Sequence, residues 1–184
     1  LCQDLEEVKT ECIKIKLPAI KILITGNGRV ANGAIEMLNI MGIKQVSIDE
    51  YLYNTFDEPV FVQLNSSDYH VHKKGLAFDR KEFHEQPSNF LSSFYRFTKV
   101  TDLLLACAYW HPEAPLLFTK ERMGQADFKI KVIADITCDI NGSIPATMRA
   151  SSIEDPVYDY NPQTCQLDRA FVSNQNITLM AVDN

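Results

Sequence analysis

Apolar and polar positions along the chain predict strands that alternate with helices. Lys21–Thr25 is a short, continuous apolar run, typical of a strand buried on both faces of a parallel sheet. Val30–Met41 follows with helical spacing, which places Val30 on the inward face, and Gly42 is expected to end the helix. Gln45–Ile48 is predicted to be a second strand. These segments form a unit of strand, glycine-rich loop, helix and strand.

The rest of the chain extends this pattern. Further apolar strands are predicted at Thr101–Ala108, Lys131–Ile136 and Ile177–Val182. Residues 73–97 carry phenylalanines at helix-compatible spacing, and residues 142–170 read as an irregular excursion with a short hairpin. Strands that alternate with helices indicate an α/β fold, a Rossmann-like doubly wound parallel sheet with helices on both faces. Before this predicted sheet, the pattern of residues 3–16 indicates an amphipathic helix, with acidic residues toward its start and lysines toward its end.

The stretch after the first strand has the glycine pattern of a dinucleotide-binding loop. One glycine lets the chain turn with positive φ, a second lets the backbone approach a pyrophosphate, and the helix N-terminus supplies N–H donors. Ala31 stands near the place of the third glycine, and Gly33 follows two positions later, which is a tolerated form. The alternative is a plain turn between a strand and a helix. The residues predicted to bind the cofactor here are Gly26, Asn27, Gly28, Arg29 and Val30.

A pair of acidic residues follows the predicted second strand. Asp49 is expected to end that strand about 20 residues beyond Gly28, where a carboxylate accepts hydrogen bonds from the adenosine ribose. Glu50 is adjacent and could serve instead. Because two carboxylates repel a 2′-phosphate, NAD(H) is favoured over NADP(H). The alternative is a solvent-exposed acid at a strand end.

A second cluster of candidate residues lies around the strand predicted at 131–136. Asp135 lies within it and Asp139 just past its carboxyl end, where ligands of open α/β sheets bind. Asp139 is the candidate catalytic residue, since its carboxylate could meet the nicotinamide. The alternative is an Asx-type turn made by Asp139 and Asn141 before Gly142.

Histidines and cysteines give weaker signals. His70 and His72 alternate on a strand-like segment and are expected at the surface, because no partner at metal-ligand spacing accompanies them. No metal site is predicted. His111 follows a strand on the ligand side and is a candidate pocket residue, whereas Cys138 lacks the basic neighbour that would lower its pKa.

Composition and charge exclude several functional classes. The net charge of −6 argues against a nucleic-acid partner. The chain has no apolar run of the roughly 18–20 residues that span a bilayer, and its first 16 residues lack the basic and apolar regions of a signal peptide. Five cysteines without a C-x-x-C pair indicate reduced thiols. We therefore expect a cytoplasmic protein that does not bind membranes.

Three stretches resemble a known family. They are KVIADITCDINGSIPATMRASSIEDPVYDY at 131–160, FDRKEFHEQPSNFLSSFYRF with LLLACAYWHPEAPLLFT at 78–97 and 103–119, and MAVDN at 180–184. The sequence is similar to the saccharopine dehydrogenase and lysine–ketoglutarate reductase family, within the wider alanine dehydrogenase and transhydrogenase group. The similarity covers Lys21–Asn184.

The resemblance implies roles for further residues. Ala108, Tyr109 and Trp110 would lie along the dinucleotide, and Val182 and Asn184 would approach its nicotinamide end. Asp139 matches an aspartate that reaches the active site in the alanine dehydrogenase branch. The reductases most similar in the aromatic segment tend to lack an acid where Asp49 stands, so NADP(H) stays open as the cofactor.

The resemblance also implies the activity and the partners. The chain would be the NAD(P)-binding domain of an amino-acid oxidoreductase acting on CH–NH bonds, which transfers hydride between nicotinamide and a lysine–oxoglutarate imine. Residues 1–18 would be an interdomain helix and 19–184 the dinucleotide-binding domain. The catalytic lysine and histidine of such enzymes come from a substrate domain with no counterpart here, so the chain alone is expected to be inactive. The family also suggests homodimers. The rivals are an alanine dehydrogenase domain and a non-catalytic dinucleotide-sensing module.

Overall fold

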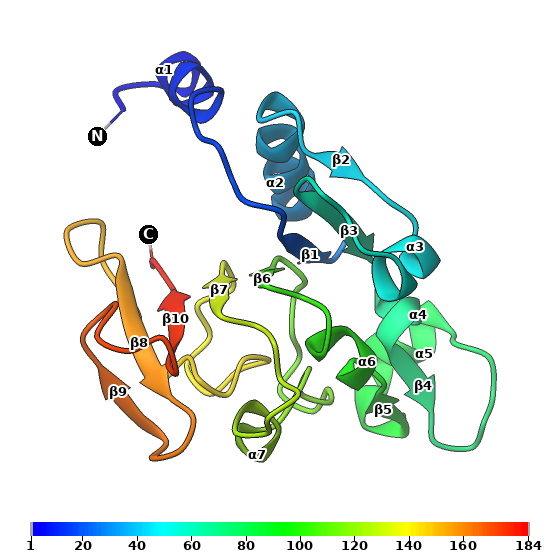
Figure 1. Ribbon diagram of the computed structural model, residues 1–184. Coiled ribbons are helices and arrows are strands. Elements are labelled where there is room, and N and C mark those ends of the chain that lie inside the picture. Colours follow the sequence, from blue (N-terminus) through cyan, green and yellow to red (C-terminus); the bar gives the residue numbers. More distant parts are fainter. Residues whose placement is uncertain (1, 184) are drawn as a thin grey trace.

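The computed structural model describes residues 2–183, and its centre is a large, mostly parallel sheet (Figure 1). Eight strands are ordered β2-β3-β1-β6-β7-β10-β8-β9. From β2 to β10 of that order neighbouring strands are parallel, and β8 is antiparallel to both of its neighbours, β10 and β9. The strands of this sheet are β1 Lys21–Thr25, β2 Lys44–Gln45, β3 Val60–Leu64, β6 Leu103–Ala106, β7 Val132–Asp135, β8 Val157–Asn161, β9 Gln166–Asp168 and β10 Ile177–Met180. The expected Rossmann-like α/β fold is confirmed.

Helices flank the sheet. The helical segments are α1 Leu5–Cys12, α2 Arg29–Ile40, α3 Ile48–Tyr53, α4 Ser66–Tyr69, α5 Arg80–Glu85, the 3₁₀ turn Pro87–Asn89, α6 Tyr95–Thr98 and α7 Lys120–Met123. Within residues 2–183, no helix combines the length and the apolar character needed to span a bilayer. In Figure 1, α1 stands apart from the sheet beside α2.

Alternate side chains of β1 enter two separate cores, as expected for a strand covered on both faces. Ile22 and Ile24 pack with Ala31 and Leu38 of α2. Leu23 belongs to the larger core on the opposite face, which contains most of the buried aromatic rings. The first strand is therefore buried from Ile22 to its end at Thr25, where the glycine loop begins.

The structure confirms the helix predicted after the glycine loop, but its bounds and the exposure of Val30 differ from the prediction. α2 spans Arg29–Ile40, and Met41 is its C-cap. Gly42 follows with φ of +75°, which is the left-handed conformation that glycine adopts after a helix. Val30 was expected on the inward face, but it is 48% exposed and lies at the edge of a cleft. Leu38 is buried as expected.

The prediction of the second strand is confirmed only at Gln45, and its expected length is wrong. The expected strand Gln45–Ile48 is instead β2, only two residues long, and Ser47 then caps α3. β3 occupies the position beside β1, paired from Lys21 with Val60 to Thr25 with Leu64. The chain thus runs from β1 to the edge strand β2 and back to β3. β6 then pairs with the other side of β1, so the order in which the chain adds strands to the sheet reverses between β1 and β6.

A lobe replaces the single helix suggested by the phenylalanine spacing. Its two-stranded sheet pairs β4 His70–His72 with β5 Phe90–Ser92. Phe83, Phe90 and His72 pack their rings with centroids 5.2 Å apart in each pair, Phe83–Phe90 and His72–Phe90. Aromatic packing, not a continuous helix, therefore accounts for the spacing. The hairpin expected in residues 142–170 is β8–β9, and it extends the main sheet.

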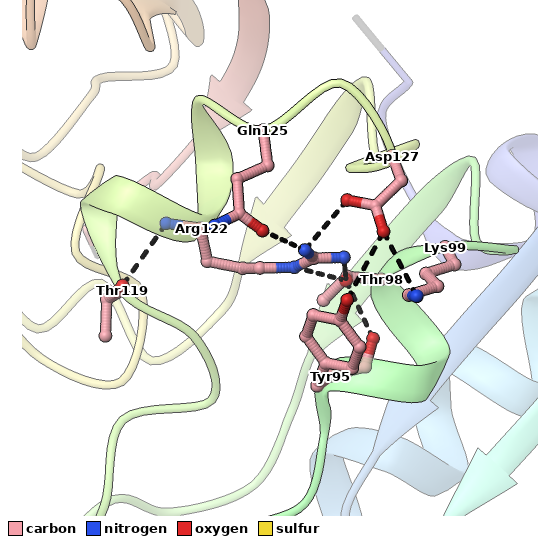
Figure 2. A network of polar contacts seen from close by, with 7 residues as sticks. All are labelled: Tyr95, Thr98, Lys99, Thr119, Arg122, Gln125 and Asp127. Atoms are coloured by element: carbon pink, nitrogen blue, oxygen red, sulfur yellow. Dashed lines mark hydrogen bonds and ion pairs between the residues drawn. The ribbon is translucent and has the colours of Figure 1, made fainter.

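An ion-pair network ties α6 to α7 at the amino ends of β6 and β7 (Figure 2). The buried Arg122 guanidinium donates to Thr98 Oγ1 at 3.1 and 3.2 Å and pairs with Asp127 at 2.8 Å. The hydrogen bond from Arg122, followed by that from Lys99, lowers the pKa of Asp127 to about 2. The network lies at the end of the sheet opposite to the glycine loop, so we assign it to fold stability.

Candidate functional site

A cleft of about 940 Å³ lies at the carboxyl ends of the central strands. It is bordered by the segments that follow β1, β3, β6 and β7. It therefore lies at the point where the strand order reverses, between β1 and β6. Such a switch point is the usual ligand site of an open α/β sheet. The residues that line it are Gly26, Asn27, Gly28, Arg29, Val30, Asn65, Ser66, Ser67, Phe78, Arg80, Phe83, His84, Cys107, Ala108, Tyr109, Ile136, Thr137 and Asp139.

Gly26 makes the turn that brings the chain from β1 into the cleft. Its φ is +93°, and its N–H donates to the Leu64 carbonyl oxygen at 2.8 Å. The Gln63 side chain donates to the Gly26 carbonyl oxygen at 3.0 Å. A Cβ on Gly26 would lie 3.0 Å from Cα of Ala108. The turn therefore needs glycine for its backbone conformation and for the close approach of the segment after β6.

The amino end of α2 opens into the cleft without a side chain in front of it. Gly28 is the N-cap with φ of −85°, no side chain caps the helix, and its first turn carries no acid. The first helical hydrogen bond runs from Asn32 N–H to the Gly28 carbonyl oxygen at 3.0 Å, so the preceding N–H groups have no partner within the helix. A Cβ on Gly28 would meet nothing within 4 Å. This open, positively polarised end fits a pyrophosphate.

The loop after β7 carries Asp139 to the same cleft. Asp135, at the end of β7, is buried and accepts from Thr137 Oγ1 at 2.7 Å and Thr147 Oγ1 at 2.6 Å. Burial raises the pKa of Asp135. A Cβ on Gly142 would lie 2.5 Å from Cβ of Asp139, so only glycine fits there. The structure thus brings the glycine loop and the candidate catalytic residue Asp139 together. Gly142 N–H donates to the Asp139 carbonyl oxygen at 2.8 Å, which closes a backbone β-turn and not the Asx-type turn of the alternative interpretation.

A small aromatic pocket of about 70 Å³ adjoins the cleft and shares five lining residues with it, Ser66, Phe83, His84, Ala108 and Tyr109. Trp110 and His111 line this pocket but not the cleft, whereas Ala108 and Tyr109 line both. His111 is therefore a pocket residue, as its position after a strand suggested.

The expectation that His70 and His72 lie at the surface is wrong. Each residue is 6% exposed, because the His70 ring packs on Phe83 and His72 Nε2 lies 3.1 Å from Glu82 Oε1, both residues of α5. His70 Nδ1 lies 3.0 Å from the Ser66 carbonyl oxygen, which can only accept, so Nδ1 carries the proton. His70 Nε2 has no partner within the described residues. Burial lowers the pKa of His70 to about 4, against a smaller opposing effect of the hydrogen bond to Ser66.

The two acids proposed for the ribose lie elsewhere. Asp49 and Glu50 are in the first turn of α3 and do not line the cleft. The Glu50 carboxylate accepts from Ser47 N at 2.9 Å and Ser47 Oγ at 2.8 Å, and these bonds lower the pKa of Glu50. Spacing places both acids wrongly because residues 45–48 are not the strand beside β1. Because neither acid lines the cleft, their ribose-binding role stays a prediction.

Two other predicted residues lie at the carboxyl end of the chain. Val182 forms a parallel bridge with Ser151 beyond the end of β10 and does not line the cleft. Asn184 lies outside the described residues.

Sequence reasoning missed the residues that follow β3. Asn65, Ser66 and Ser67 line the cleft, as does Arg80 at the start of α5. The signal was present in the apolar run Val60–Leu64, which has the same character as β1. A strand there would have placed these polar residues at its carboxyl end.

Comparisons with known proteins identify several enzymes of similar sequence. The chain is 25% identical over 181 residues to an alpha-aminoadipic semialdehyde synthase of Arabidopsis thaliana, a match that covers 85% of the chain and 17% of that protein. It is 25% identical over 187 residues to the mitochondrial alpha-aminoadipic semialdehyde synthase of Mus musculus, covering 90% of the chain and 20% of that protein. The enzyme of Bos taurus is 24% identical over the same length.

No family profile matches the chain. The chain spans about a fifth of the length of the curated relatives that it matches. These relatives confirm the resemblance indicated by the three sequence stretches. The chain is thus distantly similar to part of the alpha-aminoadipic semialdehyde synthases, which are lysine–ketoglutarate reductases and saccharopine dehydrogenases.

Proposed function

We propose that this chain is the NAD(P)-binding domain of an oxidoreductase that acts on CH–NH bonds, of the saccharopine dehydrogenase or lysine–2-oxoglutarate reductase type. The observation that carries the proposal is the open amino end of α2 in a cleft at the switch point of the sheet. The same cleft contains Asp139, in a stretch that resembles the family. An alanine dehydrogenase would need the same cofactor cleft, but the similarity to alpha-aminoadipic semialdehyde synthases favours the first function.

The residues of the cleft divide into two roles along its length. The Gly26–Arg29 loop would hold the pyrophosphate through backbone N–H groups and the Arg29 guanidinium. The loop Thr137–Asp139, two strands away, would adjoin the nicotinamide, which supplies or accepts the hydride when the dinucleotide is bound. Asp139 would orient the substrate amine or a water, and the buried Asp135 holds its loop.

Acid–base chemistry would come from a partner substrate domain. Asp139 is the only carboxylate among the described residues that line the cleft, and one exposed carboxylate does not make an acid–base pair. We therefore expect this chain to bind cofactor and to catalyse little by itself, with the amino-acid substrate held by a separate domain.

We expect Gly28→Asp to weaken the binding of NADH and NADPH equally, by about tenfold. Its carboxylate would cap α2 and occupy the positive end that the pyrophosphate needs, so the stability of the fold should not fall. Calorimetric titration of the purified chain with each nucleotide measures the effect, and urea unfolding checks the fold.

Gly33→Ala is the matched control. Gly33 lies in the same helix and is exposed, and a Cβ added to it would meet nothing within 4 Å, so affinity should be unchanged. The alanine should raise helix stability by up to about 1 kcal/mol. Failure of the wild-type chain to bind either nucleotide, or unchanged affinity in Gly28→Asp, would contradict the proposal.

A further inference from the structure

Two buried side-chain nitrogens without a partner belong to residues that line the same aromatic pocket. They are His70 Nε2 and Trp110 Nε1, and neither has a hydrogen-bond partner within residues 2–183. A buried polar atom without a partner carries a desolvation cost that a bound molecule can offset. The occurrence of two such atoms at one pocket therefore indicates a binding site.

The two nitrogens offer one acceptor and one donor. His70 Nδ1 donates to the Ser66 carbonyl oxygen at 3.0 Å, which leaves Nε2 of the neutral ring as the acceptor. Burial lowers the pKa of His70 to about 4, so the ring is neutral at physiological pH. The indole N–H of Trp110 can only donate. A complementary group must therefore accept one hydrogen bond and donate another.

The donor and the acceptor come from separate parts of the fold. His70 is 6% exposed in β4, and its ring packs on Tyr69 and Phe83 with centroids 4.5 and 4.4 Å apart. Trp110 belongs to the segment after β6, and Thr25 at the end of β1 also lines the pocket. The pocket thus lies where the lobe meets the carboxyl ends of β1 and β6.

Charge and size limit the group that fits the pocket. Its lining is mostly aromatic and aliphatic, and among the described residues no Asp, Glu, Lys or Arg belongs to it. A carboxylate or an ammonium group would therefore lose its hydration without gaining an opposite charge. A cavity of about 150 Å³ holds benzene, so one of about 70 Å³ holds a group of roughly three or four heavy atoms. The adenine and nicotinamide rings of a dinucleotide are too large for it.

We propose that the aromatic pocket is a subsite for a small neutral primary amide, separate from the dinucleotide site. The amide N–H donates to His70 Nε2, and the amide carbonyl oxygen accepts from the Trp110 indole. None of the residues Gly26–Arg29 and Thr137–Asp139, which we assign to the pyrophosphate and the nicotinamide, lines the pocket. Because five residues line both the pocket and the cleft, a bound amide would act as an effector that orders one wall of the cleft.

The indole N–H resonance of Trp110 provides a direct readout in NMR titrations, because the chain has a single tryptophan. We expect acetamide, titrated to about 100 mM, to move this resonance downfield with a dissociation constant in the millimolar range. Acetone has a similar shape but no donor, and acetate carries a charge, so both should bind at least about tenfold more weakly. Equal shifts from all three molecules, or no shift from acetamide, would overturn the proposal.

His70→Phe removes the acceptor and leaves the readout in place. Phenylalanine keeps the ring packing on Tyr69 and Phe83 but lacks Nε2, so acetamide should bind about tenfold more weakly. Tyr51→Phe is the matched control, since it removes a buried hydroxyl that donates to Thr101 Oγ1 at 2.9 Å outside the pocket. It should keep the affinity of wild type. A His70→Phe variant that binds acetamide as tightly as wild type would contradict the proposal.

Titrations with acetamide in the presence of NADH or ADP-ribose separate the subsite from the dinucleotide site. NADH carries a carboxamide on its nicotinamide ring, whereas ADP-ribose has none. Acetamide should still shift the Trp110 resonance when either nucleotide is saturating, because their rings do not fit the pocket. Displacement of acetamide by NADH, with or without displacement by ADP-ribose, would assign the pocket to the cofactor and overturn the proposal. Failure of both nucleotides to bind would contradict the proposed function and leave the result of the acetamide titrations unaffected.

Discussion

Gly26→Ala is expected to lower the free energy of unfolding by about 3 kcal/mol, the larger part from steric contact and the rest from backbone strain. The residue has φ of +93°, which L-residues rarely adopt. The added Cβ would lie 3.0 Å from Cα and 3.2 Å from N of Ala108, and these are backbone atoms shortly after the end of β6, which cannot move aside as cheaply as the end of a flexible side chain. Urea unfolding of the two proteins, followed by circular dichroism, measures the loss.

Gly28→Ala provides the control two residues later. Gly28 has φ of −85°, and a Cβ there meets nothing within 4 Å. Its loss of stability should stay below about 1 kcal/mol, which reflects the poorer N-cap alone. A Gly26→Ala variant as stable as Gly28→Ala would show that the segment after β6 can withdraw from the loop. The close approach would then not be part of what shapes the cleft.

Local pattern was sufficient to predict the half of the site built on β1 and α2. A five-residue apolar strand, a pair of glycines and a helix with apolar periodicity occur consecutively. Each is specified by neighbouring residues, and their contacts with one another are short in sequence. The same holds for β7 and Asp139, because a strand end and the loop after it are also local features.

Strand order could not be predicted in the same way. β2 and β3 both follow α2, and only β3 has the length and apolar faces to fill the place beside β1. Which strand takes that place depends on burial across the sheet, a property of the assembled fold. Sequence spacing therefore points to Asp49 for the ribose position, whereas the polar residues at the end of β3 line the cleft.

The lobe between β3 and β6 shows a second kind of failure. The spacing of Phe83, Phe90, Phe94 and Phe97 is compatible with one helix, but the segment forms α5, β5 and α6. Ring-to-ring packing across β4 and β5 satisfies the same apolar positions. The burial of His70 could not be predicted because Phe83, which packs on its ring with centroids 4.4 Å apart, comes from a different element, α5.

The buried His70 leads to the second large effect, a loss of stability in mild acid. Burial lowers the pKa of His70 to about 4 in the folded protein, from 6.5 for an ordinary histidine. The unfolded chain therefore takes up a proton at higher pH than the folded one. The stabilisation from the neutral ring is present above pH 6.5 and is lost as the pH falls from 6.5 toward about 4. Between pH 7.5 and 5 the loss should be about 2 kcal/mol.

Urea unfolding of wild type and His70→Phe at both pH values isolates this contribution. Phenylalanine keeps the packing against Tyr69 and Phe83 but does not titrate, so the pH-dependent loss should be smaller in the variant by about 2 kcal/mol. His84→Gln, at an exposed position of α5, should retain the loss seen in wild type. Equal losses in wild type and His70→Phe would assign the acid sensitivity to other groups.

The same titration should be visible at the cleft. His70 Nδ1 is bonded to the carbonyl oxygen of Ser66, and Ser66 lines the cleft. A proton on Nε2, which has no partner among the described residues, puts a charge into a buried ring and favours conformations in which the ring reaches water. Loosening of the segment after β3 would then precede global unfolding, so the buried histidine that stabilises the lobe also holds Ser66 at the cleft.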